Sequence, residues 1–202
     1  MEKEKQIEQL RKLRDKSELL RNAHSLLCAK NKSSSKILHG LILISSCIVA
    51  ILTFADHEDF LVILNNLTDD LYKVGVGILA SLVFILTVLE EFLNLNSKAS
   101  SHESAVKQLT TFIRSADALE KKKEFHNEDI KRLTTQYTII NENIPLIPDK
   151  TFFKAKQQLK RKIYISKTLD NKPFIPIWII KLTYFYDQSS GYLFRKNKKN
   201  DK

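Results

Sequence analysis

Side chains of the types used in catalysis are sparse in this sequence of 202 residues. No two histidines are four residues apart, and none has a carboxylate at the spacing of a zinc site. The histidines are His24, His39, His57, His102 and His126. The cluster of Glu124, His126, Glu128 and Asp129 would spread around the circumference of a helix, which favours a solvated face over a metal site.

Other signs of enzyme chemistry are missing from the sequence. The four glycines are too few and too dispersed for a phosphate-binding loop, and there is no nucleophile elbow. Cys28 and Cys47 fall in different predicted surroundings, one cytoplasmic and one within a membrane, so we expect no disulfide. The sequence therefore predicts a protein that is not an enzyme and holds neither a metal nor a cofactor.

Two apolar segments decide the predicted fold class. Residues 37–55 carry no charge and, as a helix, cover about the 30 Å of a bilayer's hydrocarbon core. Residues 74–89 form a shorter uncharged run, where Lys73 can snorkel outward at one end and Glu90 and Glu91 can lie among headgroups at the other. The alternative is a soluble bundle with two unusually apolar core helices. We favour an all-α membrane protein: a two-helix transmembrane hairpin with long cytoplasmic helices packed as a bundle or coiled coil.

Charge predicts the orientation of the hairpin. The net charge of +10 is unevenly spread. Residues 1–36 carry ten Lys or Arg and five Asp or Glu, and residues 90–202 carry twenty-two Lys or Arg and thirteen Asp or Glu. Residues 56–73, in contrast, carry one Lys and five Asp or Glu. Short loops rich in Lys and Arg stay on the cytoplasmic side, so we expect a multi-pass protein of the cell (inner) membrane with both termini cytoplasmic. The first span follows a long charged helix, so we expect no cleavable signal peptide.

These patterns divide the chain into four parts. The first is a cytoplasmic amphipathic helix (1–36) with a polar joint at residues 30–36, and the second is the hairpin (37–93). The hairpin has spans of about 37–55 and 73–92 and an external linker, 56–72. The third part is a cytoplasmic helical region (94–172), and the fourth is an aromatic segment with a basic tail (173–202). Residues 97–143 form one long helix or two with a break around His126 and Asn127. A further helix follows the Pro145 and Pro148 turn and ends between Asp170 and Pro173.

Apolar stripes predict the buried helix faces. The N-terminal stripe is Ile7, Leu10, Leu13, Leu20 and Leu27; the next is Ala105, Leu109, Phe112, Ala116, Leu119, Ile130, Leu133, Tyr137 and Ile140; the last is Phe152, Ala155, Leu159 and Ile163. For two segments the sequence leaves two interpretations open. Residues 60–67 lie along the outer membrane surface or extend a hairpin helix, and residues 173–186 pack in the cytoplasmic bundle or form an interfacial belt.

Polar and small residues recur on one face of each span. This polar face comprises His39, Ser46 and Thr53 in the first span and Gly77, Ser81 and Thr87 in the second. Small residues let membrane helices approach closely, so one interpretation is packing, within the hairpin or in a homo-oligomer. The other is that several hairpins line an aqueous path with acidic mouths that favour cations. The mouth charges would be Asp56, Glu58 and Asp59 outside and Glu90 and Glu91 inside.

The helix after the proline turn is strongly basic. Three interpretations remain: a solvated face, the headgroups of an anionic leaflet at about 1 kcal/mol for each Lys or Arg, and nucleic acid, which we favour least. The candidate headgroup contacts are Lys154, Lys160, Arg161 and Lys162.

The order of these parts resembles the SLATT families (SMODS and SLOG-associating two-transmembrane effector domains), in particular their fifth group. The resemblance covers about residues 5–185 and includes the stretch LTTQYTIINENIPLIPDKTFFKAKQQ after the hairpin. It implies a membrane effector of prokaryotic anti-phage or conflict systems. Such an effector oligomerises and forms a pore or perturbs the membrane when its cytoplasmic region receives a nucleotide signal or meets a defence-system partner protein. The alternative is a membrane-anchored scaffold that binds a partner protein through its cytoplasmic helices.

Overall fold

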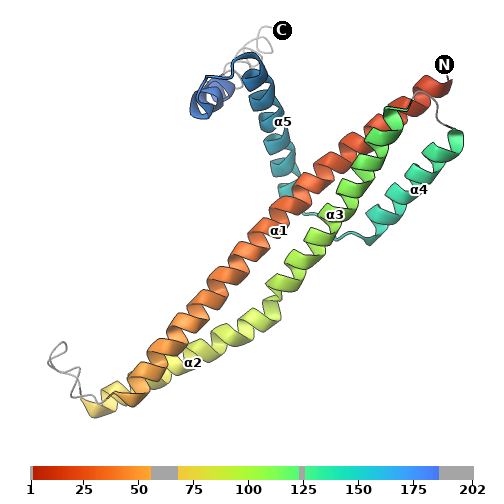
Figure 1. Cartoon of the computed structure of the whole chain (residues 1–202). Coiled ribbons are helices and arrows are strands. Elements are labelled where there is room, and N and C mark those ends of the chain that lie inside the picture. Colours follow the sequence, from red (N-terminus) through yellow and green to blue (C-terminus); the bar gives the residue numbers. More distant parts are fainter. Residues whose placement is uncertain (1, 56–67, 123–125, 187–202) are drawn as a thin grey trace, which may run out of the picture. The chain divides into compact units, whose positions relative to one another are not determined.

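The computed structural model describes residues 2–55, 68–122 and 126–186, with side chains from Gln6 onward. Within these ranges the secondary structure is helical and includes no strand, which confirms the all-α prediction. The helices are α1 (Glu2–Phe54), α2 (Asp69–Leu93), α3 (Leu95–Glu120), α4 (Asn127–Asn143) and α5 (Asp149–Asn171), followed by a shorter helix, Ile177–Tyr186 (Figure 1).

Helix α1 joins the charged N-terminal stretch and the first apolar segment in one element of 53 residues. The expectation of a joint at residues 30–36 is therefore wrong. The stretch contains three serines but neither proline nor glycine, and serine lowers helix propensity by only a few tenths of a kcal/mol. Nothing in it removes a backbone hydrogen bond, so the helix continues through it.

Helix α2 has a clear signal at each end. The hydroxyl of Thr68 accepts a hydrogen bond from the backbone N–H of Leu71, and Asp69 and Asp70 occupy the first turn, where the helix dipole favours negative charge. The helix thus begins four residues before the span predicted to start at 73. It ends at Asn94, whose left-handed backbone (φ 45°, ψ 44°) closes the last turn, and α3 begins at the next residue.

Residues 97–143 form two helices, which confirms the second of the two alternatives for this region. Helix α4 begins after a local cap: the carboxylate of Asp129 accepts a hydrogen bond from the backbone N–H of His126 at 3.2 Å. Helix α5 follows Pro148 and ends at Asn171, as the proline turn and the sequence near Pro173 predicted. Residues 60–67, Glu124 and the tail after Tyr186 lie outside the described residues.

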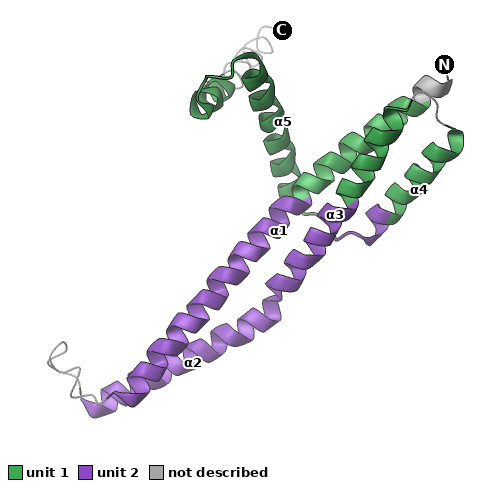
Figure 2. Cartoon of the chain, viewed as in Figure 1, with its two compact units in different colours: residues 1–23, 109–139, 146–202 green, residues 24–108, 140–145 purple. Residues whose placement is uncertain are grey.

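The chain divides into two compact units (Figure 2). Unit 1 comprises residues 1–23, 109–139 and 146–202, and unit 2 comprises residues 24–108 and 140–145. The predicted series from Ala105 to Ile140 is buried at all nine positions across the two units. Its three- and four-residue spacing therefore identified the buried face correctly.

In unit 1, α3 and α4 contribute most of the core. Phe112 is fully buried, and its ring lies 5.5 Å from that of Tyr137 between centroids. Arg14 of α1 adds an ion-pair cluster with α3: its Nη1 lies 3.3 Å from Oδ1 of Asp117 and 2.7 Å from Oε2 of Glu120. These contacts hold the N-terminal part of α1 against the end of α3.

The N-terminal stripe is only partly correct. Of its five leucine and isoleucine positions only Leu10 is buried, whereas the small residues Ser17 and Ala23 are fully buried. The Ser17 hydroxyl can be buried because it donates to the backbone oxygen of Leu13 at 2.8 Å. Small side chains at a helix contact allow close approach, and a search for large apolar residues overlooks them.

Of the two interpretations of residues 173–186, packing holds for one face of the helix Ile177–Tyr186, whereas the interfacial belt stays a prediction. Ile180 is buried, and the ring of Tyr184 lies 4.9 Å from that of Tyr164 on α5, so one face packs inside unit 1. Trp178 and Tyr186 are exposed on the other side. On α5 itself Ala155 is buried, Phe152 and Leu159 are half-buried, and Ile163 is exposed, so the last stripe is shallower than predicted.

Candidate functional site

Two helices of the described chain are long and apolar enough to cross a membrane. Their apolar side chains point outward: Ile44 is 63% and Phe84 70% exposed. Between residues 37 and 54, all described, only Ile42 is buried, and no residue of α2, which is described throughout, is buried. In a soluble bundle such segments would form the core. Their exposure favours an apolar environment outside the chain, as a bilayer would provide.

The two apolar segments meet along a narrow seam in unit 2. Its buried and half-buried positions recur at three- and four-residue intervals, as expected for packed helices. They are Leu38, Ile42, Ser45, Val49 and Leu52 on α1 and Tyr72, Val76, Leu79, Val83, Leu86 and Glu90 on α2. At the end of the seam near the C-terminus of α1, the Tyr72 hydroxyl lies within hydrogen-bond distance of the backbone oxygens of Leu52 and Ala55. It satisfies carbonyls at the end of α1.

The predicted polar face lies beside this seam and not within it. Its side chains at Ser46, Thr53, Ser81 and Thr87 are exposed. Three of the hydroxyls donate to the backbone oxygen four residues earlier, at 2.7 Å for Thr53 and 2.9 Å for Ser81 and Thr87. Their donors are therefore satisfied inside the helix, which makes these residues tolerable in lipid and leaves the hydroxyl oxygens able to accept further hydrogen bonds.

The glycines of the spans are not needed for contact within one chain. A Cβ atom added at Gly40, Gly75 or Gly77 would meet no described atom within 4 Å. Close approach of the two spans of one chain therefore does not explain the glycine at position 77, nor the small exposed residue one turn further along, Ser81. A seam between chains and the lining of a pore both stay predictions.

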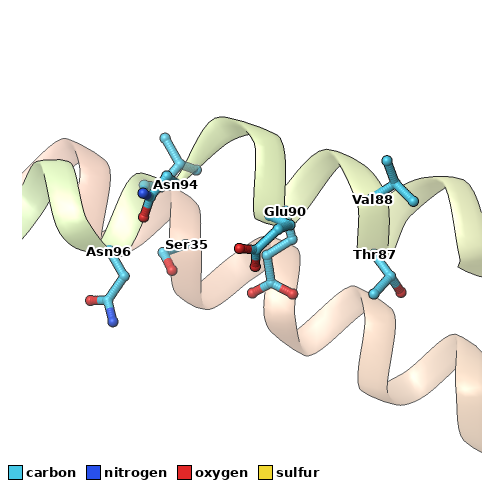
Figure 3. A pocket seen from close by; sticks show the side chains of 8 residues that line it. Ser35, Thr87, Val88, Glu90, Asn94 and Asn96 are labelled. Carbon is cyan, nitrogen blue, oxygen red and sulfur yellow. The ribbon is translucent and has the colours of Figure 1, made fainter.

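At the end of the hairpin that the charge pattern predicts to be the inner one, the structure brings several predicted residues together. Nδ1 of His39 lies 3.3 Å from Oε1 of Glu90, which joins the polar face of α1 to the inner mouth charge of α2. A cavity of about 440 Å³ opens beside them. Its lining residues are Ser35, Thr87, Val88, Glu90, Glu91, Asn94, Leu95 and Asn96. Figure 3 shows the Glu90 side chain directed from α2 toward α1.

This inner cavity combines two carboxylates with neutral hydroxyl and amide groups. Such a lining suits a cation or water, since it offers oxygen ligands and negative charge. The sequence identified Glu90, Glu91 and Thr87 but missed Ser35, Asn94 and Asn96. The spacing could have indicated Asn94 as a lining residue. It follows Glu90 by four residues, and residues four apart lie on the same side of a helix. The outer mouth charges Asp56, Glu58 and Asp59 lie outside the described residues.

Asn94 forms the joint between the second apolar helix, α2, and helix α3. It is the one non-glycine residue with positive φ in the described part of the chain. Its backbone N–H donates to the oxygen of Glu90 at 3.2 Å, and its own carbonyl accepts from the N–H of Lys98 at 3.1 Å. Figure 1 shows the chain changing direction between α2 and the beginning of α3. Asparagine suits the position because it tolerates the left-handed conformation better than most residues.

Substitution of Asn94 tests the strain at this joint. We expect Asn94→Ala to destabilise unit 2 by about 1 kcal/mol relative to Asn94→Gly, because glycine adopts positive φ without steric cost. The measurement is the unfolding midpoint of the purified protein in a denaturing-detergent titration. Asn96→Ala, within regular helix two residues later, serves as control and should be close to wild type. Equal unfolding midpoints for Asn94→Ala and Asn94→Gly would show that the left-handed backbone at this position causes no strain.

The histidines are less scattered in space than in the sequence. In unit 2, Nδ1 of His24 lies 2.9 Å from Nδ1 of His102, and both side chains are buried. Nε2 of His24 is buried without a hydrogen-bond partner among the described residues. A buried N–H without an acceptor is costly, so we infer that His24 carries its proton on Nδ1 and donates it to His102.

Burial disfavours charge on this histidine pair. It lowers the pKa of His24 to about 4, with a further contribution from nearby His102, and it also lowers the pKa of His102. The nearest charged residue in sequence, Glu103, pairs with Lys107 at 3.0 Å and with Lys32 at 3.9 Å. The pair therefore acts as a neutral, hydrogen-bonded part of the contact between α1 and α3 in this unit. The sequence carried a signal for the burial of each histidine but not for their pairing, since His102 precedes Ala105 by three residues and His24 follows Ser17 by seven.

The candidate headgroup contacts lie on α5 in unit 1. Lys154, Lys160, Arg161 and Lys162 are all exposed. Asp149 and Asp170 are the acidic residues of this helix, one in the first turn and one near the end. The exposed charges between them are available to an anionic surface, and contact with lipid stays a prediction.

The chain was compared with family models, curated proteins and solved structures, and none of the three comparisons gave a match.

Proposed function

We propose that this chain is a non-enzymatic membrane effector of the SLATT type. In this proposal the two apolar helices span the inner membrane with both termini in the cytoplasm. Several copies assemble and form a pore, or perturb the bilayer, when the cytoplasmic helices receive the signal of a prokaryotic anti-phage or conflict system, from a nucleotide or from a partner protein. The bilayer and further copies of the chain are its partners.

One observation carries this proposal: apart from His39, which contacts Glu90, the polar face of the spans lies outside the contact between the two spans of one chain. Ser46, Thr53, Ser81 and Thr87 lie outside the seam between α1 and α2. Polar residues in a membrane helix tend to face other helices or water. With the seam already formed by other residues, the polar face is available to neighbouring copies or to an aqueous path. The acidic inner cavity at Glu90 and Glu91 supports cation preference for such a path.

Leucine substitutions on the polar face test the proposal. We expect induction of the wild-type chain in bacteria to arrest growth and depolarise the membrane, and proteoliposomes to release an entrapped cation. Ser46→Leu and Gly77→Leu should reduce release to near the level of empty vesicles, because they place bulky apolar groups on the assembling face. Dye-reported membrane potential and cation efflux are the two measurements.

The spans contain matched controls for both substitutions. Gly75→Leu makes the same change as Gly77→Leu two residues away, and at both positions a Cβ meets open space, so neither disturbs the seam through its Cβ. Cys47→Leu plays the same role beside Ser46. Both controls should keep depolarisation. If the inserted wild type causes no flux with any trigger, or if controls and test variants behave alike, the pore is excluded. A membrane-anchored scaffold then becomes the better description.

A further inference from the structure

The C-terminal helix Ile177–Tyr186 carries large apolar side chains that are exposed on one of its faces. Trp178 is 64% and Phe185 73% exposed, and Leu182 and Tyr186 are exposed beside them. The spacing of 178, 182 and 185 places these three side chains on one side of the helix. The opposite side is anchored, since Ile180 is buried and Tyr184 contacts Tyr164 of α5. The helix is thus held in the unit with its largest apolar groups facing outward.

The adjoining face of α5 is basic and also carries an exposed aromatic residue. Lys156, Lys160 and Lys167 share a helix side with Phe153, which is 61% exposed. Tyr164 follows Lys160 by four residues and precedes Lys167 by three, so it belongs to the same side. Its ring contact with Tyr184 therefore brings the C-terminal helix against the lysine-bearing side of α5.

Among the described residues, ion pairs do not neutralise this basic side. No ion pair within the described residues involves a lysine or arginine of α5. Exposed lysines beside exposed tryptophan and phenylalanine match an anionic lipid surface. Lysine ammonium groups attract lipid phosphates, while aromatic rings enter the boundary between headgroups and acyl chains. Tryptophan in particular prefers this boundary, because its ring is apolar and its N–H can remain hydrated.

We propose that the outward face of the helix Ile177–Tyr186 and the lysine side of α5 together form a peripheral binding surface for an anionic bilayer leaflet. This surface is separate from the two spans. It goes beyond the proposed pore, because it would hold unit 1 on the leaflet whether or not a pore forms. The aromatic residues enter the interface, and Lys156, Lys160 and Lys167 set the preference for anionic lipid.

Trp178 makes the test direct, because it is the only tryptophan in the sequence. The full chain is reconstituted into vesicles of phosphatidylcholine alone or with phosphatidylglycerol, each with and without brominated acyl chains that quench tryptophan fluorescence on contact. We expect a blue-shifted emission and strong quenching in the phosphatidylglycerol vesicles, with weaker effects in phosphatidylcholine. Raising the salt concentration should reduce the difference, because screening weakens attraction to the leaflet.

Charge-matched variants identify the lysines responsible. The triple variant Lys156→Gln, Lys160→Gln, Lys167→Gln should lose most of the extra quenching in anionic vesicles. A control that removes three exposed charges elsewhere in unit 1, by Lys121→Gln, Lys131→Gln and Arg132→Gln, should retain it. Circular dichroism confirms that each variant keeps its helix content.

Three results would overturn the proposal. One is water-like emission without quenching in both lipids. Another is quenching that does not depend on lipid charge or on the three lysines. The third is a blue shift that persists in detergent and rises with protein concentration, which would assign the face to contact between chains. The readout is independent of ion flux, so failure of this surface and failure of the pore are distinguishable.

Discussion

Acidification from about pH 7.5 to about pH 4.5 is expected to loosen the contact between α1 and α3 in unit 2. The histidine pair is the cause. His24 in the unfolded chain has an ordinary pKa of 6.5, while burial and nearby His102 lower its pKa in the folded chain to about 4. The unfolded state therefore takes up the proton first as the pH falls. Stability is fully present above pH 6.5 and is lost progressively toward pH 4, by on the order of 3 kcal/mol.

The double variant His24→Leu, His102→Leu isolates this contribution. It replaces the hydrogen-bonded pair by apolar side chains, so its free energy of unfolding should vary much less between pH 6.5 and pH 4.5. Hydrogen exchange of residues 20–30 and 98–106 in detergent micelles reports the local opening in each protein. His126→Gln, at an exposed histidine, should keep the acid sensitivity of the wild type. The same acid response in the double variant would show that other groups cause it.

Truncation of Phe112 is expected to have the largest effect on unit 1. The side chain is fully buried and contacts the ring of Tyr137, so Phe112→Ala removes a large apolar contact and leaves a cavity. Such substitutions cost about 3–5 kcal/mol. We expect a lower unfolding midpoint and faster hydrogen exchange in α3 and α4, measured on the full chain in detergent.

Tyr137→Phe is an informative control in the same contact. The Tyr137 hydroxyl is buried and has no hydrogen-bond partner among the described residues. Its removal keeps the ring that packs on Phe112 and relieves an unsatisfied polar group, so stability should be unchanged or higher by about 1 kcal/mol. A Phe112→Ala protein as stable as Tyr137→Phe would mean that this contact does not support unit 1.

The sequence predicted the helices and one buried face well, for a physical reason. The series from Ala105 to Ile140 follows the helix period with large apolar side chains, and hydrophobic burial responds directly to that pattern. The break between α3 and α4 and the start of α5 were also predictable, because local contacts determine them. Asp129 caps the first turn of α4, and Pro148 directly precedes the first turn of α5. The unbroken course of α1 through residues 30–36 was missed, because a run of polar residues suggests a joint although it costs a helix little.

The candidate site was predictable only in part, because its geometry depends on contacts between distant residues. Small polar residues in the apolar segments identified one helix face. The seam, however, is formed by positions such as Ile42 and Val76, which have the same kinds of side chain as their exposed neighbours. The pairing of His24 with His102 joins residues 78 positions apart. Spacing within one helix carries no information on such a pair, even when each member lies on a buried stripe.

The joint at Asn94 implies a constraint on how this sequence can change in length. A single residue separates α2 from α3, so the helical phase of Glu90 is fixed relative to that of His102. One inserted residue would turn everything on one side of the joint by about 100° relative to the other, and the inner cavity or the histidine pair would lose its register. We therefore expect descendants of this sequence to tolerate substitutions between residues 90 and 102 far better than insertions or deletions.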